Sequence, residues 1–101
     1  MIGLSSNRCE LDGELFELEV LRYTPAGIPR IGLKNRHVST QQQAVMARQL
    51  MCTVPALALG EAAVQVSRFQ LGQTVHVTGF LAQRSLRIAQ LVLHIDNITL
   101  K

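Results

Sequence analysis

Arginine is the cation that this sequence uses most, and its chemistry suits the binding of phosphate groups. Eight of the ten lysine and arginine side chains are arginines. A planar guanidinium offers paired N–H donors to a phosphate and also stacks on a nucleobase, which a lysine ammonium does not. The eight are Arg8, Arg22, Arg30, Arg36, Arg48, Arg68, Arg84 and Arg87. This composition favours a phosphate-bearing partner.

The segment Arg22–Val38, RYTPAGIPRIGLKNRHV, concentrates cationic side chains around a turn. Its prolines and glycine are typical of chain reversals, so we expect Thr24–Pro29 to be the turn of a hairpin. Beyond the turn the side chains alternate, and alternate residues of a strand point to opposite faces. The two faces carry Ile31 and Leu33 on one side and Lys34 and Arg36 on the other.

The charge of the chain is unevenly distributed along the sequence. Residues 1–21 hold one basic and five acidic side chains, for a net charge of −4, whereas residues 22–101 hold nine basic and two acidic, for +7. A basic field raises the local concentration of a polyanion. The sequence therefore predicts an electrically two-sided molecule, although a solvated surface would show the same charges.

Aromatic side chains are few, which limits base stacking. Stacking on an aromatic ring contributes about 1–3 kcal/mol per base in single-strand binding. The chain has no tryptophan, and its aromatics are Phe16, Tyr23, Phe69 and Phe80. The alternation places Phe16 and Phe80 in the core and leaves Tyr23 exposed beside the turn. We therefore expect electrostatics to supply more of the affinity than stacking.

No motif in the sequence indicates an enzyme or a cofactor. The chain lacks GxSxG, GxxxxGK[ST], GxGxxG and HExxH. His94 and Asp96 share a strand face, but no nucleophile lies near them in the sequence. Cys9 and Cys52 lie far apart and form no metal-binding spacing, so we expect buried thiols in a reducing compartment, no metal site and no cofactor.

The elements that must position these side chains are mainly strands, because apolar residues recur with a period of two. In a long first strand, Phe16, Leu18 and Val20 are expected to face the core, and Gly13 to allow a bend or bulge. A second strand follows the turn, and Ser39–Gln43 reads as a loop. The remaining strands are predicted over Val45–Val54, where Pro55 ends the third, over Thr74–Leu81, and over Arg87–Leu100. A short helix is expected near Glu61–Phe69.

At 101 residues the chain is expected to form one domain, 1–101, whose hydrophobic core needs no disulfide or metal to hold it together. We see no secretory signal and no apolar stretch long enough to span a membrane, which favours a cytoplasmic protein. Five strands with a helix after the third make a small barrel or a sandwich the natural candidates.

A set of short motifs, in order along nearly the whole chain, resembles the family of primosomal replication protein N (PriB), a relative of bacterial single-strand-DNA-binding proteins. Each motif is short, and the ordered set carries the resemblance. The motifs are Asn7-Arg8, Gly13, Thr24–Pro29, Leu33–Val38, Arg48-Gln49 followed by Cys52, Gly79-Phe80 and Leu91–His94.

This resemblance implies an all-β fold, a five-stranded OB-fold Greek-key barrel with a short helix or loop between strands 3 and 4. It further implies a non-catalytic homodimer that binds single-stranded DNA and assists the restart helicase and loader proteins of the replication-restart primosome. The cations of the hairpin would then track the phosphates along the barrel face. An OB fold also matches the strand count and the helix position expected above.

The resemblance also suggests which residues would contact DNA. Arg22, Arg36 and Arg48 match positions where the family has basic residues, and Arg84 and Arg87 lie in the loop between the last two strands, which is lysine-rich in the family. Met51 stands where the family often has a stacking tryptophan. The predicted nucleic-acid-binding set is Arg22, Lys34, Arg36, Arg48, Met51, Arg84 and Arg87.

Methionine provides a polarizable apolar surface but no aromatic face. The sequence therefore leaves a second function open, a dimeric adaptor of the primosome that recruits helicase or loader and binds DNA weakly. An OB domain that binds RNA is a third.

Overall fold

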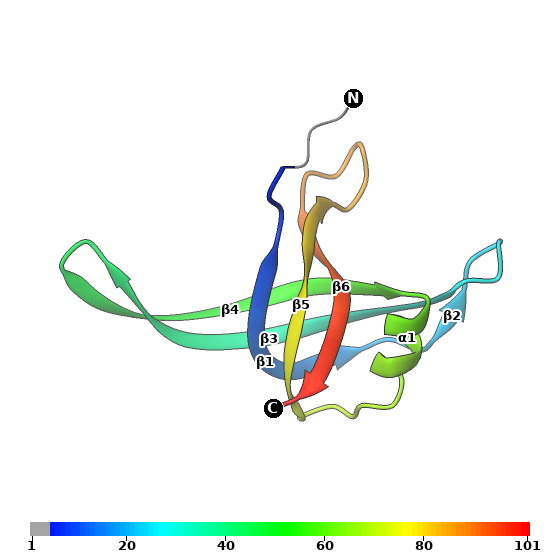
Figure 1. Ribbon diagram of the computed structural model, residues 1–101, viewed down its shortest axis with the longest axis horizontal. Helices are drawn as coiled ribbons and strands as arrows, with labels where there is room; N and C mark the ends of the chain where they lie inside the picture. Colours follow the sequence, from blue (N-terminus) through cyan, green and yellow to red (C-terminus); the bar gives the residue numbers. More distant parts are fainter. Residues whose placement is uncertain (1–4) are drawn as a thin grey trace.

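The computed structural model describes residues 5–101, which form six strands and one helix (Figure 1). In chain order these are β1 (Cys9–Leu18), β2 (Arg22–Tyr23), β3 (Pro29–Gln43), β4 (Met46–Leu59), α1 (Glu61–Val66), β5 (Thr74–Gln83) and β6 (Leu91–Leu100). Among the described residues, no helix has both the length and the apolar character that crossing a bilayer requires.

Five of the strands close into a barrel, as the OB fold predicts. The sheet order is β1-β5-β6-β4-β3-β2, and β1 also pairs with β3, so the ring closes and the two-residue β2 adds to its edge. Strands β4 and β6 pair in parallel over Ala56 and Leu57, and the other pairs are antiparallel. Helix α1 lies between the third and fourth barrel strands, as predicted, and is shorter than the expected Glu61–Phe69.

Small and branched apolar side chains fill the barrel. Inward positions alternate along each strand, for example Val75 and Val77 on β5, both fully buried. Helix α1 contacts β3, β4 and β6 and adds Ala63 and Val66 to the same core. The fully buried core consists of leucine, isoleucine, valine and alanine, and the aromatic Phe69 packs against its edge, partly buried.

Strand β1 and the residues after it bury only one of the three side chains predicted to face the core, Leu18, which packs against it. The register of β1 against β3 shifts between Leu15 and Glu17, so that Leu15 is 1% exposed while Phe16 is 41% and Val20 79% exposed. A one-residue bulge moves the following side chains to the other face of a sheet. The predicted bend is nevertheless near Gly13, because β1 exchanges β5 for β3 as its partner at Glu14.

The β3–β4 hairpin is longer than the sequence indicated. Ser39–Gln43, predicted as a loop, continues β3, and β4 runs through Pro55 instead of ending there. The pairing is unbroken from Arg30 opposite Leu59 to Gln43 opposite Met46. Proline is accommodated because β4 pairs with β6 only from Ala56 onward, which leaves that edge free at residue 55.

The outer half of this hairpin extends beyond the barrel (Figure 1). Strand β3 pairs with β1 only as far as Arg36, so residues 37–43 of β3 and 46–52 of β4 pair only with each other. The turn of the shorter hairpin, at the other end of β3, matches the prediction for Thr24–Pro29. There the Thr24 N–H donates to the Ile28 carbonyl at 2.9 Å and Gly27 has φ 82°.

Substitution of Gly79 tests how closely the backbones of β5 and β6 approach each other. A Cβ at Gly79 would lie 1.9 Å from the backbone oxygen of His94, beside a register shift between Thr78 and Gly79. Because that oxygen belongs to the backbone, Gly79→Ala is expected to lower the free energy of unfolding by about 1–3 kcal/mol, measured by urea denaturation. Gly32→Ala is the control. The three atoms nearest to a Cβ there belong to the Glu19 side chain rather than to the backbone, so its cost should be smaller. Equal stability of Gly79→Ala and wild type would contradict the contact.

Candidate nucleic-acid interface

The outer face of β3 carries a row of cations. Because Ile31 and Leu33 are buried in the core, the alternating residues Arg30, Lys34 and Arg36 face outward. Strand β2 adds Arg22 directly opposite Arg30. Three of the predicted binding residues, Arg22, Lys34 and Arg36, thus lie along one strand pair, together with Arg30, which the prediction omitted.

An open groove with a volume of about 340 Å³ brings part of this row against the β5–β6 loop. Arg30 and Lys34 line it from β3, and Arg84 lines it from the loop. The loop is anchored by two hydrogen bonds between Arg84 and Gln90: the Arg84 N–H donates to the Gln90 carbonyl at 2.8 Å, and Nη1 donates to Oε1 at 3.2 Å. Apolar atoms of Pro55 and Leu57 also line the groove.

The other predicted residues lie away from this groove. Arg48 and Met51 belong to the projecting part of the β3–β4 hairpin, where Arg48 pairs with Gln41 and Met51 with Val38, on opposite faces of the ribbon. The Arg48 Nη1 donates to Gln43 Oε1 at 2.8 Å, and Met51 is 68% exposed. Arg87 is exposed in the β5–β6 loop and does not line the groove. Of the predicted set, Lys34 and Arg84 therefore line the groove, and Arg22 and Arg36 extend the cation row outside it. Arg48 and Met51 lie on the hairpin, and Arg87 lies in the loop.

Phe16 and Phe80, predicted as core residues, lie on the surface instead. The Arg36 guanidinium carbon is 3.7 Å from the centroid of the Phe16 ring, a cation–π contact. The Phe80 ring stacks on His94 with centroids 5.0 Å apart and an interplanar angle of 10°. Tyr23 is 67% exposed, as predicted. The surface thus has more aromatic area than the sequence indicated.

Two comparisons with known proteins agree with this geometry. The model of a family described as "another single-strand binding protein family" matches residues 7–97. The replication restart protein PriB of Nitrosomonas europaea is 35% identical over 93 residues, which cover 92% of this chain and 86% of that protein.

The chain belongs to the PriB family.

Solved structures support the fold of this PriB-family chain. The PriB protein of Ralstonia solanacearum superposes with a TM-score of 0.86 at 33% identity, covering 96% of this chain and all of the other. The single-stranded DNA binding protein of Thermus aquaticus has a TM-score of 0.77 at 20% identity and covers 95% of this chain and half of its own. The second likeness shows the shared OB fold. The relative from Nitrosomonas europaea is named for replication restart.

In the described part of the PriB-family chain, the lysines form ion pairs and the arginines do not. Within residues 5–101, no arginine takes part in an ion pair, whereas Lys34 Nζ lies 3.3 Å from Glu17 Oε2 and Lys101 is paired with Asp12. Glu17 and Glu19 also line the groove. The prediction of two electrically separate sides is therefore wrong at the groove, where acidic side chains of the N-terminal stretch lie among the cations.

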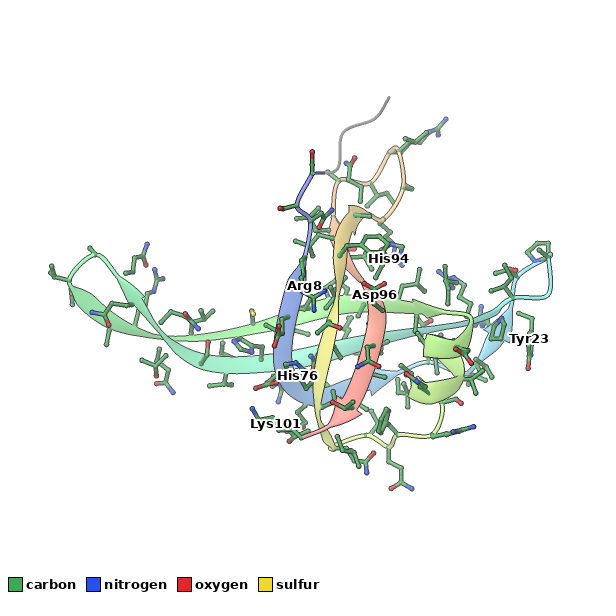
Figure 2. The ribbon with its side chains drawn as sticks, in the orientation of Figure 1. Arg8, Tyr23, His76, His94, Asp96 and Lys101 are labelled. Atoms are coloured by element: carbon green, nitrogen blue, oxygen red, sulfur yellow. The ribbon has the colours of Figure 1, made fainter. Side chains whose placement is uncertain are left out.

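A charged cluster on the β1–β5 surface involves a different set of residues. His76 Nδ1 lies 2.5 Å from Asp12 Oδ1 and its Nε2 lies 3.1 Å from Glu10 Oε1. Lys101 bonds the other Asp12 oxygen, and Figure 2 shows His76 and Lys101 near the C-terminal end of the barrel, apart from His94. The hydrogen bond from Lys101, followed by that of His76, holds the pKa of Asp12 below its ordinary value of 3.8. In residues 5–101 no three or more His, Cys, Asp or Glu side chains are arranged to hold a metal ion.

The sequence did not predict Arg30 as a binding residue or Phe16 as an exposed one, and the sequence signals for these two residues differ. Arg30 shares the even-numbered face of β3 with Lys34 and Arg36, so the alternation alone was sufficient to include it. Phe16 required knowledge of the β1 bulge, which no residue type in the segment indicates. Asp96 forms no ion pair among residues 5–101, and His94 stacks on Phe80, so the sequence pair His94 and Asp96 is not a linked acid–base unit.

From the contacts of Asp12 we predict how the free energy of unfolding depends on pH. Because folding lowers the pKa of Asp12, its contribution is complete above the unfolded value of 3.8 and is lost as the pH falls through the folded value. Asp12→Asn should be less stable than wild type at pH 7 and should lose less stability on acidification, measured by urea denaturation from pH 7 to pH 2. Asp96→Asn, which removes an exposed aspartate outside the cluster, is the control. Parallel pH profiles for wild type and Asp12→Asn would contradict this role.

Proposed function

We propose that this chain is a non-catalytic, single-stranded-DNA-binding accessory protein of the replication-restart primosome. The observation that carries the proposal is the convergence of Arg30, Lys34 and Arg84 on one groove of the OB barrel. Loops and strand faces of OB folds commonly bind single strands. Membership of the PriB family, whose relatives are named as replication restart proteins, supports the cellular process.

In this proposal the strand runs along the outer face of β3. Its phosphates contact Arg22, Arg30 and Arg36 and then Arg84 at the groove, with Lys34 contributing when its pair with Glu17 opens. Guanidinium groups without ion pairs suit this task, since each offers paired donors to a phosphate without first breaking an ion pair. Phe16 beneath Arg36 provides an adjoining aromatic surface.

The projecting hairpin provides a second contact. Seven residues of β3 beyond the barrel extend the ribbon by about 23 Å, which places Arg48 and Met51 well outside the groove. Arg48 would bind a phosphate and Met51 would support a base by apolar contact. Arg87 in the β5–β6 loop would add a phosphate contact close to Arg84.

The partners in the proposal are single-stranded DNA, a second copy of the chain, and the restart helicase and loader of the primosome, in the cytoplasm. Exposed apolar residues on the hairpin, such as Val38 and Met51 at 55% and 68%, are available for protein contacts. The alternative, a dimeric adaptor with weak DNA binding, is favoured by Glu17 and Glu19, because carboxylates in the groove oppose phosphates.

A charge-reversing substitution in the groove distinguishes the DNA-binding function from the adaptor function. Arg84→Glu should weaken binding to a single-stranded oligonucleotide by about tenfold or more and lower the steepness of log affinity against log salt by about 0.7, measured by fluorescence anisotropy at several salt concentrations. Arg68→Glu is the matched control, since Arg68 follows α1 and does not line the groove. Duplex DNA and RNA of the same length test selectivity. Equal losses for the two variants, or a salt-independent wild type that still pulls down the helicase, would favour the adaptor.

A further inference from the structure

Glu19 lines the groove, and the fold fixes its backbone beside β3. Its backbone N–H donates to the Gly32 carbonyl at 2.9 Å, which attaches the chain after β1 to the middle of β3. A Cβ at Gly32 would lie 2.5 Å from Glu19 Oε1 and 2.8 Å from its Cδ. The carboxylate therefore occupies the space that a side chain at position 32 would fill, and it lies against the surface of β3.

This carboxylate is available as a hydrogen-bond acceptor. Within residues 5–101, Glu19 takes part in no ion pair, whereas its neighbour Glu17 is paired with Lys34. An ionised carboxylate accepts hydrogen bonds and donates none. A phosphate at this point would be repelled, so the ligand group that fits beside Glu19 must offer hydrogen-bond donors, as the exocyclic amine of a base does.

The rest of the groove suits a planar base. Pro55, Leu57 and Val92 provide apolar lining, and His94, itself stacked on Phe80, provides an aromatic one. A volume of about 340 Å³ lies at the lower end of the range for small-molecule sites, which leaves room for a single nucleotide rather than a length of strand. Arg30 and Arg84 at the same groove are available to the flanking phosphates.

We propose that the groove is a nucleobase pocket in which Glu19 selects a base with an exocyclic amine. This inference rests on the proposed function and concerns which base the single strand places there. In single strands the Watson–Crick edges of the bases are free to bond with protein. Cytosine presents its N4 amine to the carboxylate, whereas uracil and thymine present a carbonyl oxygen at that position. Adenine and guanine also carry amines and belong to the accepted class.

Cytosine and uracil make the sharpest comparison, because they differ only at N3 and C4 of one ring. Uracil has a single N3–H, flanked by two carbonyl oxygens that the carboxylate repels. One charge-assisted hydrogen bond predicts that oligo-deoxycytidine binds about three- to tenfold more tightly than oligo-deoxyuridine. Both strands are taken at about sixteen nucleotides, the upper end of the site size for one OB fold.

The experiment measures both affinities by fluorescence anisotropy for wild type, Glu19→Gln and a control, Glu61→Gln. Glu61 opens helix α1 and does not line the groove. Glutamine presents both a carbonyl and an amide, so Glu19→Gln should tighten oligo-deoxyuridine by about three- to tenfold and abolish the preference. Glu61→Gln should keep the wild-type preference. Urea denaturation of each variant verifies that it is folded.

Three results would overturn the inference. A wild type that binds both strands equally has no base selection, and this result leaves the proposed function standing. Equal tightening of both strands by Glu19→Gln would mean that the carboxylate only repels phosphates. A wild type that binds neither strand overturns the proposed function and this inference together. Because the wild-type comparison needs no variant, the test holds even where Glu19→Gln does not fold.

Discussion

Closure of the barrel is the constraint on which the surface chemistry depends. Strand β1 pairs first with β5 and then with β3, so β3 becomes a wall with one face inside and one outside. Ile31 and Leu33 are then buried, and the intervening and following even-numbered residues must face outward. The same geometry places the end of β1 beside β3, with Leu18 opposite Leu33 and the Glu19 N–H bonded to the Gly32 carbonyl. The acidic residues that follow the bulge therefore lie beside the cations of β3 rather than on a separate side.

In this arrangement, different side chains would provide the affinity for a nucleic-acid strand and the selectivity among its chemical groups. Arginines without ion pairs supply a salt-sensitive attraction for any polyanion, whereas Glu17 and Glu19 oppose phosphate within the groove itself. A groove that mixes both signs with apolar lining discriminates among the groups placed in it, since each must satisfy an acceptor, a donor or an apolar contact. The PriB-family chain lacks tryptophan, so its aromatic contacts are limited to side chains such as Phe16 and the Phe80–His94 stack.

The regular parts of the fold were predictable because their signals are local. Alternation in β5 and β6 and the turn at Thr24–Pro29 follow from side-chain period and backbone preference. The outer half of the β3–β4 hairpin was not predictable from the sequence. Its run of three glutamines has no alternation, and the chain reverses with Ala44 at φ 55° instead of a glycine. Its strand structure comes from the partner strand. Likewise, the exposure of Phe16 depends on a bulge, and the place of Glu19 in the groove depends on a contact with Gly32, both of which exist only once β1 and β3 meet.

In the proposed function, the groove between β3 and the β5–β6 loop receives the single strand. Amide correlation spectra recorded by NMR during titration with single-stranded DNA test it most directly, because they report each backbone position separately. The account predicts the largest changes at Arg30, Lys34, Leu57 and Arg84, with little change at His76 and Thr99 on the β1–β5–β6 surface. Changes centred on His76 and Thr99, with an unperturbed groove, would contradict it.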